Sequence, residues 1–243
     1  MTWRMLDLFS GIGGFSLAAQ WCWEDELEIV AFCEIDKFCQ KILKKHWPEV
    51  PIIGDIKKIK ENRWGTIDLI CGGFPCTQTS TMAAIQSCRK GLNGKDSSLW
   101  FEYLRVVQII RPIWILVENP QGVLTWKNTI ETGLERAGYR VSRFQRTAWS
   151  IGAPHLRRRV FFIAHSMRKR CEKMARIGNA SENAPLYTWP APPRGTWRTP
   201  RARTHRMDDG IPNRVDRLKS LGNAIVPQVA YQIFKGIKQL NEK

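Results

Sequence analysis

The chain has 243 residues and a formal net charge of +16, from 38 lysines and arginines against 22 aspartates and glutamates. This length is enough for one large domain, or a domain and a half, with a sizeable buried core. The charge favours a polyanionic partner, most simply nucleic acid, over a basic face that only aids solubility. The seven cysteines form no C-x-x-C pair. That argues against a disulfide scaffold or a zinc site and favours a reduced intracellular protein.

The sequence gives no sign of export or of membrane insertion. Residues 1–4 lead directly into a predicted strand rather than into a signal peptide. No apolar run approaches the roughly 20 residues needed to span a bilayer. We therefore expect a cytoplasmic protein that does not bind membranes.

A strand over residues 5–9 runs into the glycine-rich turn 10–14, and an apolar helix follows over about 15–21. A strand, a glycine turn and a helix N-terminus together form a nucleotide-type pocket. The spacing is not G-x-G-x-x-G, because Ser16 stands where the third glycine would be, and no G-K-[S/T] follows. This argues against a dinucleotide and a phosphate-binding P-loop, and about half of such turns are only tight connections.

A second strand over residues 29–33 ends at Glu34. An acidic residue about 20 positions beyond a glycine turn is where a ribose diol is held, although an N-cap or a surface acid is an equal alternative. A helix over 37–47 follows and stops at Pro48. Asp55 could then accept a hydrogen bond from an adenine amino group, or it could cap a turn.

The next strand, residues 68–71, runs into Gly-Gly-Phe-Pro and then presents Cys76. Two glycines and a proline cannot continue a strand or start a helix interior, so the backbone must turn sharply here. A further strand over 113–117 ends in Glu118. Because open α/β sheets place their ligands at the carboxyl ends of strands, we predict that this nucleophile and this acid meet.

The polar stretch 77–97 is glycine-punctuated and basic, with little periodicity. Its length favours a mobile loop that closes over nucleic acid, rather than a plain connection. The remaining patterns predict helices over about 98–111 and 129–137, strands around 139–144 and 160–164, and a helix opened by Pro227. The arginines 157–159 precede the strand at 160–164, where they could form a charged strand edge or grip phosphates or a base oxygen.

Residues 166–210 differ from the rest, with clustered prolines, interleaved arginine and tryptophan, and 10 basic against 4 acidic residues. Almost no apolar periodicity runs through them. This composition is expected of a partly irregular insertion that faces nucleic acid.

Five motifs, in order, resemble the cytosine-C5 DNA methyltransferase family of bacterial and phage type. Any one of them is weak, but five at suitable spacing are specific, and they span nearly all of the chain outside 166–210. They are D-L-F-S-G-I-G-G-F at 7–15 for the first motif, G-G-F-P-C with Ser80 for the fourth, Glu118-Asn119 for the sixth, G-A-P-H-L-R-R-R-V-F-F-I-A at 152–164 for the eighth, and R-L-K-S-L-G-N-A-I-V-P at 217–227 for the tenth.

The resemblance implies an α/β fold with a doubly wound, mostly parallel, Rossmann-like sheet that carries S-adenosylmethionine at its carboxyl edge and releases S-adenosylhomocysteine. It divides the chain into three parts. Residues 1–165 form the catalytic and cofactor-binding domain, and 166–210 form a target-recognition segment that is short for the family. Residues 211–243 hold the C-terminal motif and a helix that packs back on the catalytic domain.

The resemblance also assigns cofactor residues. Phe9 would stack on the adenine, Gly11 and Gly13 would let the methionine end approach, Glu34 would hold the ribose, and Asp55 would bind the adenine amino group. The same pocket would include Ile35, Ile56, Pro75, Leu99, Asn223 and Ala224.

Catalysis is assigned by the resemblance to Cys76, Glu118, Arg157 and Arg159. A Cys76 thiolate adds to cytosine C6 and makes C5 reactive toward a sulfonium methyl. Glu118 holds the N3 and amino edge, which needs a protonated or proton-sharing carboxyl, and the arginines hold the base oxygen and order the site. The C5 proton is then removed and the thiol is eliminated. None of this is reachable inside a duplex, so the base must flip out.

The implied partner is double-stranded DNA, bound by a monomer without a metal ion, in a bacterial or phage-infected cell. A restriction endonuclease is a candidate functional partner. One alternative is a tRNA cytosine-C5 methyltransferase of the same fold, which an assay on deoxyribose and ribose substrates would distinguish. Another is a catalytically silent DNA-binding protein, although the intact Cys76 and Glu118 argue against it. The glycine spacing and the Pro-Cys turn disfavour a nicotinamide-dependent enzyme.

Overall fold

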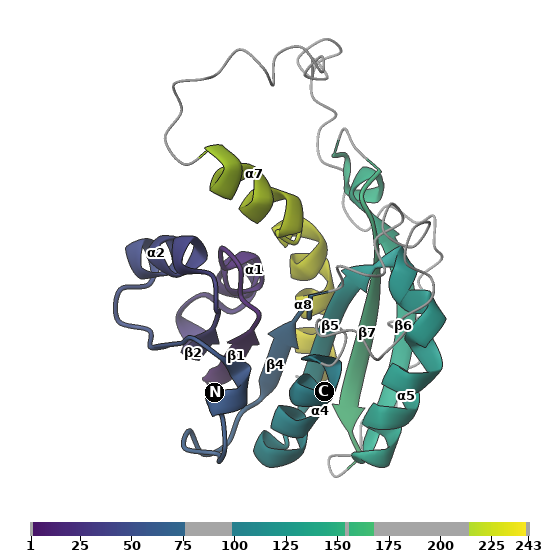
Figure 1. The fold of residues 1–243 in the computed structure, drawn as a ribbon. Coiled ribbons are helices and arrows are strands. Elements are labelled where there is room, and N and C mark those ends of the chain that lie inside the picture. The colour runs from purple at the N-terminus through teal and green to yellow at the C-terminus, as the bar shows by residue number, and fades with distance from the viewer. Residues whose placement is uncertain (1, 76–98, 154–155, 168–213, 242–243) are drawn as a thin grey trace.

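The computed structural model describes residues 2–75, 99–153, 156–167 and 214–241, which form an α/β domain with helices on both faces of one sheet (Figure 1). The sheet has seven strands in the order β3-β2-β1-β4-β5-β7-β6. The strands are β1 (Trp3–Leu8), β2 (Leu27–Cys33), β3 (Ile52–Ile53), β4 (Leu69–Gly72), β5 (Trp114–Pro120), β6 (Tyr139–Thr147) and β7 (Arg158–Ser166). The predicted fold class, a mostly parallel α/β sheet, is confirmed.

The direction of β7 decides which of its residues lie near the carboxyl ends of the parallel strands. Strands β1 to β5 pair in parallel, whereas β7 runs antiparallel to both of its neighbours, β5 and β6. The start of β7 therefore lies beside the end of β5, and Arg159 is paired in register with Pro120. Because β7 is antiparallel, Arg159 lies at the carboxyl edge of the parallel strands.

The described ranges contain six α-helices. They are α1 (Gly14–Trp23), α2 (Lys37–His46), α4 (Leu99–Ile110), α5 (Lys127–Arg136), α7 (Arg214–Asn223) and α8 (Pro227–Asn241), with short 3-10 turns η1 (Glu24–Glu26), η2 (Ile56–Lys58), η4 (Gln121–Trp126) and η5 (Ala148–Ile151). No helix in these ranges combines the length and the apolar character that crossing a bilayer requires.

Alternate residues of the central strands point into two separate hydrophobic layers, one on each face of the sheet. Ile115 and Val117 of β5 face a layer shared with α4 and α5, whereas Trp114 and Leu116 face a layer shared with α1 and α8. Both faces of a mostly parallel sheet are covered by helices, which is why its strands are apolar nearly throughout. In the second layer α8 packs along α1, with the ring of Phe234 5.1 Å from that of Trp23.

Most predicted elements are present with ends shifted by a few residues, but α7 and the short strand β3 were not predicted. Helix α7 has no buried apolar stripe, since Val215, Leu218 and Leu221 are exposed. Polar contacts to distant parts of the chain hold it instead, and those leave no periodic signal in the sequence. The predicted loop 77–97 lies outside the described residues, as does nearly all of the predicted insertion 166–210.

Gly72, the last residue of β4, has no room for a side chain. A Cβ there would press on the backbone carbonyl oxygen of Leu8 in β1 and lie 3.0 Å from the ring of Tyr103. The backbone oxygen cannot move without breaking the register of the sheet. Glycine therefore lets β1 and β4 close up at the edge where both strands end.

Replacing Gly72 by alanine should lower the free energy of unfolding by about 1–3 kcal/mol, the usual cost of overpacking a well-packed core. Urea unfolding measures the loss. Gly222 is the matched control, because a Cβ at Gly222 would have open space around it. Gly222→Ala should be neutral or slightly stabilising, since alanine favours a helix more than glycine does. Equal losses in the two variants would contradict the packing assigned to Gly72.

Candidate active site

The glycine turn after β1 has a backbone that side chains rarely tolerate. Three of its residues have positive φ angles: Phe9 at 52°, Gly11 at 54° and Gly13 at 84°. Such an angle is uncommon for a bulky residue such as phenylalanine, and strained residues of this kind cluster at functional sites. A Cβ on Gly13 would lie 2.5 Å from the ring of Trp47, so this position requires glycine.

The Glu34 carboxylate closes over this turn. Its Oε2 accepts a hydrogen bond from the backbone N–H of Gly11 at 2.7 Å, and its Oε1 accepts one from the N–H of Asp36 at 2.8 Å. Burial raises the pKa of Glu34, and the two backbone donors oppose that rise. The N-cap of α2 is Asp36, so Glu34 is not a capping residue. Each carboxylate oxygen has a second lone pair with which it can accept a further hydrogen bond.

The other residues predicted to contact the adenine differ in which of their groups a ligand could reach. Asp55 caps η2, because its Oδ1 accepts from the backbone N–H of Lys57 at 2.9 Å, and this bond leaves Oδ2 outside it. The side chain of Ile56 is buried in the core and its carbonyl oxygen accepts from Arg105 and from the N–H of Ile59, which leaves its backbone N–H as the group that a ligand could contact. Ile35, next to Glu34, is 71% exposed and presents an apolar surface.

Glu118 lies at the carboxyl end of β5 and is only 7% exposed. Its Oε1 forms an ion pair with Nε of Arg159 at 2.8 Å. Burial raises the pKa of Glu118, and the charges of Arg159 and Arg157 offset only part of that rise. The site therefore holds a buried, ion-paired carboxyl group whose pKa lies above its ordinary value, the direction that a proton-sharing contact to a base requires.

Gly73 brings the chain from β4 against Glu118. A Cβ at Gly73 would lie 2.8 Å from the backbone oxygen of Glu118 and 3.1 Å from its Oε2. Two residues later the chain reaches Pro75, the last described residue before Cys76. Cys76 itself lies outside the described residues, and Leu99, at the start of α4, packs against the core beyond that gap.

Arg157 contacts the backbone at the end of α7. Its Nη1 donates to the carbonyl oxygen of Gly222 at 2.8 Å, and its Nη2 donates to that of Ala224. Burial and the neighbouring Arg159 lower the pKa of the Arg157 guanidinium. The exposed Asn223 lies between these two carbonyls. Arg157 thus holds the end of α7 at the carboxyl edge of the sheet, a contact that the sequence pattern did not predict.

A cavity of about 690 Å³ separates the glycine turn from the junction of α7 and α8. That size is typical of small-molecule sites. Its wall is mostly apolar, apart from the guanidinium groups of Arg157 and Arg159. The lining residues are Ile12, Gly13, Gly14, Leu17, Arg157, Arg159, Leu221, Ala224, Ile225, Val226 and Pro227.

The sequence analysis assigned no role to two buried polar residues near the site. Asp7 of β1 is fully buried, and its Oδ2 accepts from Oγ of Ser16 at 2.7 Å, whereas Oδ1 has no hydrogen-bond partner among the described residues. In the same part of the chain, neither side-chain polar atom of the buried Asn119 has a partner. An aspartate inside the apolar run Met5–Phe9 was the available signal for the first. Within the described ranges, no group of three or more His, Cys, Asp or Glu side chains could hold a metal ion.

The family model for C-5 cytosine-specific DNA methylases matches residues 3–201. Type II methyltransferase M.FnuDI of Fusobacterium nucleatum is 32% identical over 165 residues, which cover 66% of this chain and 46% of the relative. M.HhaI of Haemophilus parahaemolyticus is 29% identical over 165 residues, 66% of this chain and 48% of the relative. The chain therefore spans about half the length of these curated relatives.

Solved structures share the fold. Entamoeba histolytica methyltransferase EhMeth superposes with a TM-score of 0.58 at 18% identity, over 71% of this chain and 55% of that one. A Spodoptera frugiperda DNMT2 mutant gives a TM-score of 0.54 at 23% identity, over 68% and 50%.

The Asp7 carboxyl beneath the turn should make stability depend on pH. Burial raises its pKa from 3.8 to about 7, so the folded protein holds this proton more tightly than the unfolded chain does. Stability should fall as pH rises from about 4 to about 7 and then level off. Asp7→Asn keeps an acceptor for Ser16 but does not titrate.

Urea unfolding at about pH 5 and about pH 8 tests this expectation. Relative to Asp7→Asn, the wild type should lose roughly 2–3 kcal/mol of unfolding free energy between the two pH values. The same difference between the two proteins at both pH values would show that Asp7 does not titrate in this range.

Proposed function

Since the chain belongs to the C-5 cytosine-specific DNA methylase family, we propose that it transfers the methyl group of S-adenosylmethionine to C5 of a cytosine in double-stranded DNA. One observation carries the proposal: a buried glutamate with a raised pKa, paired with Arg159, lies where Gly73 brings the chain that leads to Cys76. We infer that the Cys76 thiol acts together with this carboxyl, since a nucleophile and a proton-sharing acid suit addition to an aromatic base.

The glycine turn and its surroundings fit S-adenosylmethionine. The Glu34 carboxylate retains lone pairs for the two ribose hydroxyls, and the exposed Ile35 offers an apolar surface to the adenine. Phe9, Gly11 and Gly13 form the strained turn against which the cofactor would lie. Asp55 has Oδ2 for the adenine amino group, while Ile56 contributes backbone only. When bound, the cofactor supplies a sulfonium methyl that is open to attack by a carbon nucleophile.

The residues of the chain then act on the base. The Cys76 thiolate forms a bond to C6, and the electrons of the C5–C6 double bond make C5 nucleophilic. Glu118 shares its proton with N3 as negative charge develops on the ring, and Arg159 keeps the carboxyl in place. Once C5 carries the methyl group, a base removes the C5 proton. The C6–S bond then breaks, the double bond re-forms, and the thiolate is regenerated.

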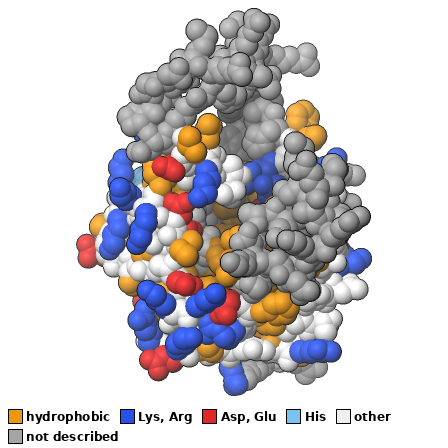
Figure 2. Space-filling model, viewed as in Figure 1, with side chains coloured by type: hydrophobic (Ala, Val, Ile, Leu, Met, Phe, Trp, Pro, Cys, Tyr) orange, Lys and Arg blue, Asp and Glu red, His pale blue; other side chains and the backbone are white. Residues whose placement is uncertain are grey.

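Basic surface supports DNA as the partner. Helix α2 exposes Lys37, Lys41, Lys44 and Lys45. Blue basic side chains gather over this part of the molecule in Figure 2. Such side chains neutralise phosphates and give salt-dependent affinity. The reaction still requires the target cytosine to leave the stack, because Cys76 must reach its C6 atom. We further propose a restriction endonuclease as a functional partner, which the type II names of the curated relatives support.

DNA in which 5-fluorocytosine replaces every cytosine should trap the adduct, because the C5 fluorine cannot leave as a proton does. Wild-type protein with S-adenosylmethionine should form a complex with this DNA that resists denaturant on a gel, and Cys76→Ala should form none. Glu118→Gln should form it about 100-fold more slowly or worse, which is the usual cost of losing a positioned acid.

Glu131→Gln is the matched control, since Glu131 is a glutamate that pairs with Arg143 away from the site. It should trap DNA as the wild type does. Trapping by Cys76→Ala would refute the assigned nucleophile. Trapping of fluorinated RNA but not of DNA would refute the assigned substrate.

A further inference from the structure

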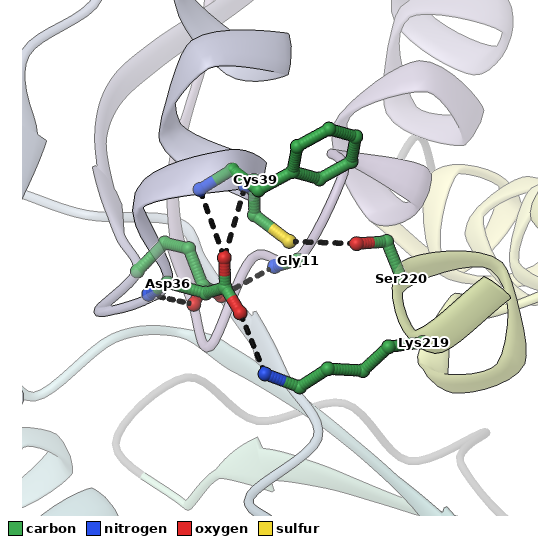
Figure 3. Close-up of polar contacts among 7 residues, drawn as sticks. Gly11, Asp36, Cys39, Lys219 and Ser220 are labelled. Atoms are coloured by element: carbon green, nitrogen blue, oxygen red, sulfur yellow. Dashed lines mark hydrogen bonds and ion pairs between the residues drawn. The ribbon is translucent and has the colours of Figure 1, made fainter. Parts of the chain in front are cut away.

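Helix α7 is tied to α2 by two side-chain contacts, shown in Figure 3. Nζ of Lys219 lies 2.8 Å from Oδ2 of Asp36, and Sγ of Cys39 lies 3.4 Å from Oγ of Ser220. Cys39 and Ser220 are buried, so the two helices meet closely rather than through solvent. The ion pair raises the pKa of Lys219 and lowers that of Asp36. These contacts join residues more than 180 positions apart.

Asp36 connects this contact to Glu34, the carboxylate that we assign to the ribose of the cofactor. Its Oδ1 caps α2 by accepting from the N–H groups of Phe38 and Cys39, and its own N–H donates to Oε1 of Glu34. One residue therefore binds α7 through Oδ2, α2 through Oδ1 and Glu34 through its backbone (Figure 3). A displacement of α7 would pull on Asp36 and so on Glu34.

The C-terminal end of α7, about one turn beyond Lys219, is fixed at the carboxyl edge of the sheet. Arg157 donates to the carbonyl oxygens of Gly222 and Ala224, and Arg159, two residues on, pairs with Glu118. Helix α7 thus bridges the carboxylate assigned to the ribose and the acid assigned to the base. Since Arg157 lines the cavity itself, Lys219 is the residue through which the bridge can be tested from outside it.

We propose that Lys219 is a positioning residue for the cofactor: through its contact with Asp36 it holds α7 on α2 and keeps the Asp36 N–H on Glu34. This inference rests on the proposed function, because it takes Glu34 as the ribose ligand. An exposed ion pair by itself contributes little to stability. The contact matters here because Asp36 is also bonded to a ligand-binding group.

Calorimetric titration with S-adenosylhomocysteine tests the proposal without DNA or turnover. Lys219→Met keeps the length of the side chain and removes its charge, and Asp36→Asn keeps the capping oxygen and removes the charge. Each should weaken binding roughly two- to fivefold, the range expected for an exposed ion pair. The double variant should be no weaker than either single variant, because both remove the same interaction. Lys219→Arg should restore wild-type affinity.

Lys127→Met, which removes an exposed lysine at the start of α5, is the control and should bind as the wild type does. The wild-type advantage over Lys219→Met should shrink as salt is added, because salt screens exposed charges. In methyl transfer, KM for S-adenosylmethionine should rise while kcat stays unchanged.

Wild-type affinity in Lys219→Met together with a lower Tm would overturn the proposal and leave an ordinary surface ion pair. Failure of the wild type itself to bind S-adenosylhomocysteine would instead overturn the proposed function, and this inference with it.

Discussion

The structure depends on one buried ion pair, in which burial and a neighbouring arginine act on Glu118 in opposite directions. Burial raises the pKa of this carboxyl, and the charge of Arg159, whose Nε lies 2.8 Å from Oε1, lowers it. A buried pair of this kind costs about 3–5 kcal/mol to break, since the remaining charge has no partner. The net effect is a raised pKa, which is the direction that the proposed proton-sharing role toward N3 of cytosine requires.

The sheet is built so that this pair can form. An all-parallel sheet would start β7 at the opposite edge, whereas the antiparallel β7 places Arg159 across from Pro120 at the end of β5. Glycine at 72 and 73 then lets β4 end against Leu8 and Glu118 without a side chain between them. The C-terminal part completes the same edge, because α8 packs on α1 and Arg157 holds the end of α7. Distant parts of the chain therefore converge on one cavity.

Local patterns in the sequence predicted the fold well, because its central strands are apolar runs that end at glycine, proline or an acid. The same patterns predicted that Glu118 lies at the end of a strand. They did not predict that Glu118 pairs with Arg159 or that its pKa is raised, since both depend on the antiparallel β7. Helix α7 was missed because the contacts of Arg157 and Lys219 join remote residues. The capping role of Asp55 was one of two alternatives that the sequence alone left open.

We propose that this edge of the sheet methylates cytosine in DNA through Cys76. The most direct measurement is bisulfite sequencing of a plasmid from a host that lacks cytosine methylation, with wild-type protein and Cys76→Ala expressed in parallel. We expect cytosines to be protected from conversion with the wild type only, and protection at one repeated motif would also identify the recognition sequence. Full conversion with a folded wild-type protein that binds S-adenosylhomocysteine, or equal protection with Cys76→Ala, would contradict it.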